Sequence, residues 1–194
     1  LNGLLARDGG PLALVVTEGF ADLLVLARQN RADLYDPIAR SPAPVFLAPE
    51  GRVVTCPARL DAAGREIVPL SASATEAVAE AVAARAPAAV AVCLLHAHVA
   101  PAHELALGAA LERRGLGPVL LSHRVDPAPR EYERAVATCA EAWLAGALDA
   151  EMAAFRGALA EAGFRGRLLA LDRTGRVAPA GALRRIDGLE GGAP

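Results

Sequence analysis

Three of the four histidines in this 194-residue chain, and one glutamate, gather in the stretch "HAHVAPAHE", residues 96–104. Imidazole and carboxylate groups bind metal ions and transfer protons, so this spacing could serve a metal site or a base with its orienting carboxylate. No HExxH or comparable helical spacing supports a metal site. The alternative is structural: His96 ends a buried strand, and Glu104 complements the positive N-terminal end of the next helix.

The faces of the expected elements decide which of these groups can meet. If the strand continues through residue 97, His96 and His98 point to the same side, and His103 and Glu104 lie on the first turn of the following helix. The carboxyl end of a parallel strand is where open α/β sheets place their ligand sites. A solvated His98 fits the structural alternative.

A second set of polar residues occupies "ARQNRADLYD", residues 27–36, after an expected helix. Arg28, Asn30 and Arg31 carry planar guanidinium and amide groups that suit a carboxylate, a phosphate or a cyclic imide. The structural alternative is a helix end that favours arginine, followed by a turn that favours Asn and Asp. Composition alone does not separate the two.

Two further segments carry polar residues that could take part in chemistry. "REYER", residues 130–134, opens a long helix with alternating charge, which is typical of a solvated face with short-range ion pairs. Ser122 and His123 are adjacent in an expected strand, so they point to opposite faces and do not form a nucleophile and base pair by themselves.

Composition excludes several classes of function. The chain has no lysine, so Schiff-base catalysis and a GxxxxGK[ST] phosphate loop are both excluded. A net charge of −2 without a run of like charges gives no electrostatic footprint for nucleic acid or a membrane surface. Three separated cysteines form no CxxC pair, which indicates a reducing, cytoplasmic location and no thiolate metal site.

The elements that must position these residues alternate along the chain. Apolar runs predict strands over 11–17, 88–95, 118–123 and 167–172, and a turn signal at 61–64 predicts a β-hairpin. Ser73 and Glu76 form a capping box for a helix from residue 74, and Pro101 opens another helix. Apolar spacings of three to five predict one long amphipathic helix over 131–164, about 45 Å long if unbroken. This order predicts an α/β fold with a mostly parallel sheet.

The residues resemble the hydantoinase A / 5-oxoprolinase family in four collinear segments that cover nearly the whole chain. These are "TEGFADLLVLARQNRADLYD", "RLDAAGREIVPL", "VAVCLLHAHVAPAHE" and "LSHRVDPAPREYERAVAT". His96, His103 and Glu104 fall on motif positions, whereas His98 falls where the family pattern is loose. The metal interpretation therefore loses its middle ligand, and we expect no metal on these histidines. The match also makes Glu131 and Arg134 candidate contacts for substrate or phosphate.

The resemblance implies a ribonuclease H-like ATPase fold of the actin and sugar-kinase type, with the hairpin as an insertion. It implies ATP and Mg²⁺, a small cyclic amide such as hydantoin or 5-oxoproline, and a second hydantoinase B-type subunit or domain. Related members carboxylate ketones. Residues 1–117 are expected to be the C-terminal part of the family's N-terminal domain, and residues 118–194 the start of the hydantoinase A catalytic domain.

Two departures from the family pattern bear on activity. The family's glycine-rich phosphate loop lies upstream of the position that matches Leu1, so we expect a piece of a longer chain that is inactive alone. Arg173 and Arg176 replace a serine and a glycine of a second glycine-rich segment, where a bulky side chain blocks close approach of the backbone to a ligand. The alternative hypothesis is a degenerate, non-catalytic homologue that serves as a scaffold or subunit.

Overall fold

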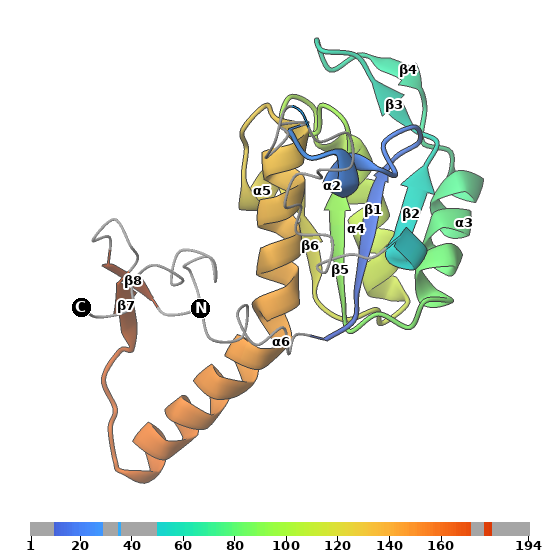
Figure 1. Ribbon diagram of the computed structural model, residues 1–194. Coiled ribbons are helices and arrows are strands. Elements are labelled where there is room, and N and C mark those ends of the chain that lie inside the picture. The colour runs from blue at the N-terminus through green and yellow to red at the C-terminus, as the bar shows by residue number, and fades with distance from the viewer. Residues whose placement is uncertain (1–9, 29–34, 36–49, 172–176, 180–194) are drawn as a thin grey trace.

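The computed structural model describes residues 10–28, 35, 50–171 and 177–179. Four parallel strands form its central sheet, in the order β2-β1-β5-β6 (Figure 1). Their bounds are β1 Leu12–Thr17, β2 Val53–Cys56, β5 Ala89–Cys93 and β6 Val119–Leu121. The predicted α/β class with a mostly parallel sheet is confirmed. Because all four strands run the same way, their carboxyl ends share one edge of the sheet.

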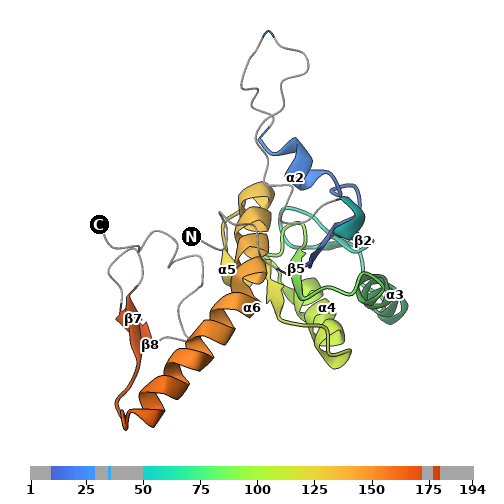
Figure 2. The ribbon, with the colours of Figure 1, turned by 60° about the horizontal axis from the view of Figure 1, so that its bottom comes forward.

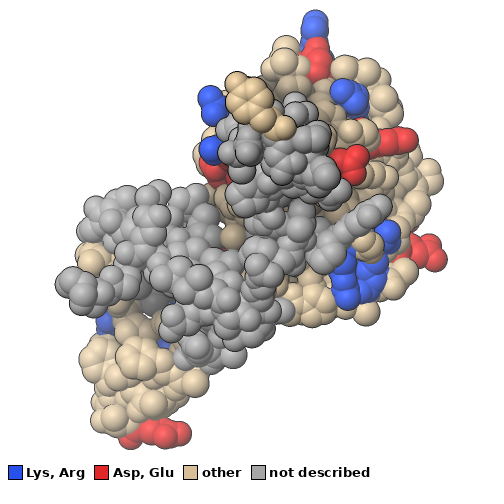
Figure 3. Space-filling model, in the orientation of Figure 1, with Lys and Arg blue, Asp and Glu red and all other residues tan. Residues whose placement is uncertain are grey.

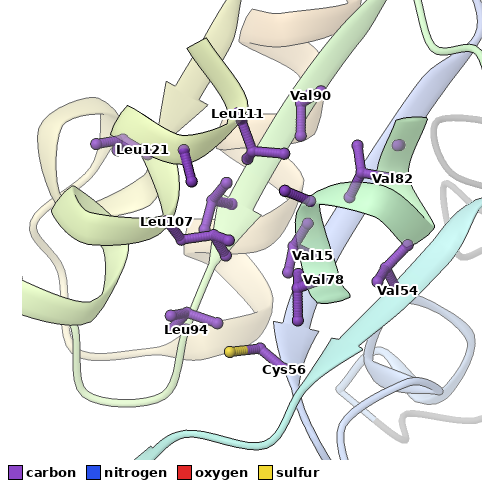
Figure 4. Packing of buried hydrophobic residues seen from close by; sticks show 14 of the residues in the cluster. Val15, Val54, Cys56, Val78, Val82, Val90, Leu94, Leu107, Leu111 and Leu121 are labelled. Carbon is purple, nitrogen blue, oxygen red and sulfur yellow. The ribbon is translucent and has the colours of Figure 1, made fainter. Parts of the chain in front are cut away.

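One face of the sheet is covered by two helices, α3 (Ala72–Ala83) and α4 (Ala102–Arg113), as Figures 1 and 2 show. Val15 of β1 points to this side and is fully buried with Val82 of α3 and Leu107 of α4. Figure 4 shows these side chains converging from strands and helices that are distant in sequence. Both faces of β1 are buried, which explains its continuous apolar run.

The long helix α6 (Glu131–Glu161) packs its first half against the opposite face. Leu14 and Val16 alternate with Val15, so they meet Cys139 and Trp143 of α6 on that side. The second half of α6 extends away from the sheet toward a small antiparallel ladder, β7 (Leu169–Leu171) with β8 (Val177–Pro179) (Figures 1 and 2). The single long helix predicted over 131–164 is confirmed, ending three residues earlier.

The predicted hairpin is present as β3 (Arg59–Leu60) and β4 (Glu66–Val68). Its turn is closed by Asp61, whose carboxylate accepts from the backbone N–H groups of Ala63 and Arg65. Gly64 adopts a φ of 78°, which a residue with a side chain rarely adopts. The hairpin could therefore be predicted from the turn residues Asp61 and Gly64.

Two local predictions were wrong. Helix α3 is capped by Ser71, whose Oγ accepts from Ala74 N at 3.1 Å, so the capping box on Ser73 does not exist. Residues Ser122–Val125 form a short helix, α5, and do not continue strand β6. The backbone turns there because His123 N donates to the Glu104 carboxylate and leaves the ladder.

Three smaller elements complete the described part. They are α2 (Leu23–Leu26), the 3-10 turn η1 (Glu50–Arg52) and the turn after β5 over residues 95–99.

Within the described residues, none of the helices is both long and apolar enough to cross a membrane. All three cysteines are free and buried, and the cytoplasmic location inferred from them stays a prediction. On the face shown in Figure 3, the described basic and acidic residues are scattered and gather in no patch of one sign.

The predicted division between residues 117 and 118 stays a prediction. The sheet itself runs across that point, because β6 pairs with β5 through Val90 and Val119, Ala91 and Leu120, and Val92 and Leu121.

Candidate functional site at the carboxyl edge of the sheet

Polar side chains gather where β1, β5 and β6 end and where α6 begins. Thr17, the last residue of β1, is buried and its Oγ1 accepts from Leu95 N at 3.0 Å. This bond joins the ends of two neighbouring strands. Strand β5 stops at Cys93, so His96 and His98 lie on a turn and not on one strand face. The carboxyl edge of a parallel sheet is the usual location of ligand sites in α/β proteins.

Glu104 forms the buried centre of this edge. Its side chain is 0% exposed, and its two oxygens accept four hydrogen bonds. Leu94 N and Ser122 Oγ donate to Oε1 at 2.9 and 2.6 Å, and His123 donates to Oε2 from its backbone N at 3.1 Å and from Nδ1 at 2.6 Å. Four donors match the acceptor capacity of an ionised carboxylate. Glu104 therefore does more than complement a helix end, because it joins β5, α4 and α5.

Arg134 is the cationic counterpart of Glu104 and is also 0% exposed. Its Nε donates to Ser122 Oγ at 3.0 Å and its Nη2 to Leu94 O at 2.7 Å. Its Nη1 donates to Ala128 O at 3.1 Å and to His98 Nδ1 at 2.9 Å. Four of the five N–H groups of the guanidinium thus reach acceptors within the protein. The predicted contact of Arg134 with substrate or phosphate stays a prediction.

His98 is held by Arg134 and is not the solvated side chain that the structural alternative described. A guanidinium can only donate, so His98 Nδ1 must be the acceptor and the ring proton lies on Nε2. Burial lowers the pKa of His98, and the Arg134 charge lowers it further, whereas Glu131 opposes the shift. His98 is therefore neutral at pH 7.

His96 and Glu131 lie beside this network. His96 adopts a φ of 58°, in the left-handed region, and its Nδ1 lies 3.9 Å from Glu131 Oε1. Both side chains are about one quarter exposed, 24% and 25%. Glu131 Oε1 itself is buried and accepts no hydrogen bond. Among the residues that the structure describes, it is the one buried side-chain oxygen or nitrogen without a hydrogen-bond partner.

The second predicted set of polar residues is only partly described. Arg28 is 60% exposed, and its Nε donates to Glu133 Oε1 at 2.6 Å, which joins the end of α2 to the first turn of α6. This bond lowers the pKa of Glu133 against an opposing effect of burial. Asn30 and Arg31 lie outside the described residues, so their predicted contacts stay predictions.

His103 is directed away from the other histidines. Its side chain is buried, and Nε2 lies 2.6 Å from Oε1 of the exposed Glu66 on the hairpin. The described part of the chain contains no group of three or more His, Cys, Asp or Glu residues that could hold a metal ion. The cysteines offer no nucleophile, because burial raises the pKa of Cys93 to about 11 and raises that of Cys139 as well.

Comparison with known proteins identifies the family of this chain. Residues 1–115 match the sequence profile of the hydantoinase/oxoprolinase N-terminal region. The chain belongs to the hydantoinase/oxoprolinase family. The earlier resemblance is thereby confirmed.

The curated relatives of this chain have names that refer to different activities or to none. The chain is 28% identical to an uncharacterised protein of Methanocaldococcus jannaschii over 86% of its own length and 24% of the relative's. It is 27% identical to the acetophenone carboxylase gamma subunit of Aromatoleum aromaticum, covering 90% of this chain and 26% of the subunit. Identity to 5-oxoprolinase 1 of Arabidopsis thaliana is 27%, over 74% of this chain and 12% of that one. The chain thus spans about a quarter or less of these relatives.

Solved structures share the fold. An ATP-dependent caprolactamase from Pseudomonas jessenii superposes with a TM-score of 0.79 at 25% identity, covering 92% of this chain and 26% of the other. A nucleotide-free acetone carboxylase superposes with a TM-score of 0.76 at 21% identity, over 91% of this chain and 26% of its own. The chain therefore shares its fold with about a quarter of each of these two proteins.

Sequence reasoning missed Thr17 and Ser122 as parts of the edge. The sequence draws attention to Ser122 only as a neighbour of His123, whereas in the structure its hydroxyl joins Glu104 to Arg134. One sequence signal could have found them. A small hydroxyl residue at the end of an apolar strand is often buried, and a buried hydroxyl needs a hydrogen-bond partner nearby.

Proposed function

We propose that the chain is part of an ATP-dependent enzyme that opens a small cyclic amide such as hydantoin or 5-oxoproline. The observation that carries the proposal is the match of residues 1–115 to the hydantoinase/oxoprolinase N-terminal region. The similarity to a 5-oxoprolinase and to an ATP-dependent caprolactamase supports it, because both of those names refer to cyclic amides.

The proposal includes a ribonuclease H-like ATPase fold of the actin type, with ATP and Mg²⁺ as cosubstrates. The described residues alone do not fit a nucleotide with its metal: Arg134 is enclosed, Arg28 is paired with Glu133, and the residues that the structure describes hold no metal-binding cluster. The nucleotide site therefore requires further parts of the protein. What the described residues supply is a rigid, polar sheet edge.

The same edge is the proposed substrate side. Arg28 is exposed and close to the start of α6, so its guanidinium can turn from Glu133 to a carboxylate or imide oxygen. Exchange of one acceptor for another costs little at an exposed site. Asn30 and Arg31 follow Arg28 in the same segment and are proposed to act with it.

A partner subunit belongs to the proposal. Acetophenone carboxylase has a subunit that is 27% identical to this chain, and the chain spans 26% of it. A second hydantoinase B-type subunit or domain is therefore proposed to complete the enzyme.

Calorimetry and turnover test the proposal together. The protein, with its B-type subunit, is titrated with ATP in the presence of Mg²⁺, and then assayed for ADP release and ring opening with hydantoin and 5-oxoproline. Binding heat and ADP release that depends on one of the two amides are expected. ATP binding without turnover of either amide contradicts the substrate assignment.

The second candidate is a degenerate scaffold or subunit, and Arg173 and Arg176 favour it. They lie outside the described residues, at positions where the family pattern has a serine and a glycine. The scaffold alternative expects no ATP binding heat but stable association with the B-type subunit in gel filtration. The double substitution Arg173→Ser and Arg176→Gly would restore binding if these two side chains alone block the nucleotide.

A further inference from the structure

We propose that His96 and Glu131 form a proton-transfer pair, in which Glu131 orients the His96 imidazole and His96 Nε2 takes a proton from the attacking water and passes it to the substrate. The proposal rests on the proposed function, since the substrate is the cyclic amide named there. The two residues come from the turn after β5 and from the first residue of α6, and both lie at the carboxyl edge of the sheet.

The first observation is the unsatisfied oxygen of Glu131. Its Oε1 is buried without a hydrogen bond, whereas Glu104 nearby has all its acceptor positions filled. A buried acceptor without a donor is energetically unfavourable, so it needs an explanation such as a catalytic role. His96 Nδ1, at 3.9 Å, is about 1 Å beyond hydrogen-bond length. Hydrogen bonds between catalytic groups are often long without substrate and shorten when it binds.

The second observation is the backbone of His96. Its φ of 58° lies in the left-handed region, which is unfavourable for a residue with a side chain. The turn is fixed from both sides, because Leu95 N donates to Thr17 Oγ1 while Val99 N and Ala100 N donate to His96 O. Strained conformations persist where the surrounding structure determines them, and they concentrate at functional sites.

The third observation is the support behind the turn. Arg134 donates to Leu94 O on one side of His96 and to His98 Nδ1 on the other. In this proposal Arg134 is a positioning residue, since it holds the backbone before His96 and the His98 ring after it. Catalytic groups must be held in position with high precision, and side chains fixed by packing and by further hydrogen bonds provide that precision.

The charges around His96 determine its tautomer. Among the described residues, Glu131 is the carboxylate beside Nδ1, His98 is a neutral ring 6.2 Å away, and the Arg134 cation lies behind His98. The only negative charge in this set lies next to Nδ1, so it attracts the ring proton to that atom. His96 Nε2 is then left as the basic nitrogen, as in other histidines that a carboxylate orients.

The proton transfers that this pair performs on a cyclic amide balance without another acid or base, and the ATP of the proposed function takes no part in them. His96 Nε2 accepts a proton from the water whose oxygen forms a bond to the amide carbon. When the C–N bond breaks, its electron pair stays on the ring nitrogen, and His96 returns the proton to that nitrogen. The ring gains one water and becomes an open amine or amide with a free carboxyl group, and His96 is regenerated.

The tautomer of His96 can be measured without turnover. The protein has four histidines, so ¹⁵N-histidine NMR spectra can be assigned by single substitutions. We expect the Nδ1–H tautomer in the wild type, and the Nε2–H tautomer, which is favoured in free histidine, in Glu131→Ala. Glu112→Ala on α4 is the matched control and should leave the His96 signals unchanged. The Nε2–H tautomer in the wild type, or equal spectra for the wild type and Glu131→Ala, overturns the proposal.

Kinetics of the enzyme with its B-type subunit give the second readout. His96→Asn suits the left-handed turn and should lower kcat for hydantoin or 5-oxoproline by at least about 100-fold, with KM within about 3-fold. Glu131→Ala should lower kcat less, by about 10-fold. A kcat of His96→Asn within about 3-fold of wild type overturns the pair. If the wild type opens neither ring, the proposed function fails, and the NMR result still decides whether the pair exists.

Discussion

Glu104 and Arg134, both completely buried at the carboxyl edge of the sheet, meet through one hydroxyl group, that of Ser122. The hydroxyl donates to Glu104 Oε1 at 2.6 Å and accepts from Arg134 Nε at 3.0 Å. The two charges thus compensate each other without a direct ion pair. Both residues also bind the backbone of Leu94: Glu104 accepts from its N–H, and Arg134 donates to its carbonyl oxygen. The two residues together therefore fix the end of β5.

Substitution Glu104→Gln should destabilise the protein by about 3 kcal/mol. The amide that replaces one carboxylate oxygen donates instead of accepting, and Arg134 loses its compensating charge in a buried environment. Urea unfolding followed by circular dichroism measures the loss. Glu76→Gln is the control: Glu76 is exposed and pairs with Arg113 and Arg114, so its replacement should leave the free energy of unfolding nearly unchanged. Equal losses for the two variants would contradict a central role for Glu104.

Arg134→Lys should also destabilise, by about 2 kcal/mol or more, although the charge is kept. A lysine ammonium has three donors at one point and cannot reach Ser122, Ala128, Leu94 and His98 together. The same replacement at the exposed Arg113 is the matched control and should change the free energy of unfolding by less than about 0.5 kcal/mol. A fully stable Arg134→Lys protein would show that the planar fork is not required.

Stability should fall as the pH is lowered through the titration of His98. Its pKa in the fold is lowered below the unfolded value of about 6.5, mainly by burial and then by Arg134, with His96 adding to the shift and Glu131 opposing it. Between the two pKa values the unfolded chain binds more protons, so this contribution is complete above about pH 6.5 and is lost below it. The free energy of unfolding, measured between pH 7.5 and 5, should fall more steeply for the wild type than for His98→Gln. Parallel curves would contradict the shift.

The strands and helices that form this edge could be predicted from the sequence, whereas most of the side-chain hydrogen bonds between them could not. Continuous apolar runs identified β1 and β5, since strands that are buried on both faces show no alternation. The turn at Asp61 and the proline before α4 identified the hairpin and a helix start. These signals are local, so they can be read from neighbouring residues.

The partners of Glu104 could not be predicted in this way. Ser122 and His123 lie 18 and 19 residues further along the chain, and Arg134 lies a further 11 residues beyond His123. Their contact depends on the parallel pairing of β5 with β6 and on the turn into α5, which the sequence pattern described as a strand. The capping error at Ser73 arises because Ser71 and Ser73 both fit a helix start, whereas Ser71 is the residue whose Oγ accepts from Ala74 N.

Glycine at position 117 sets how closely β6 approaches β5, and its replacement gives a sharp test of the sheet. A Cβ at Gly117 would collide with the carbonyl oxygen of Ala88 and lie 2.9 Å from its carbon, where backbone cannot move aside. Gly115, two residues earlier, also has a positive φ, of 66°, but a Cβ there meets nothing within 4 Å. Gly115→Ala should therefore cost about 1 kcal/mol from backbone strain alone. Gly117→Ala should cost at least about 2 kcal/mol more, because Val90 N must still reach Pro118 O to start the ladder. Equal unfolding free energies for the two variants would show that β6 can shift away from β5 without loss.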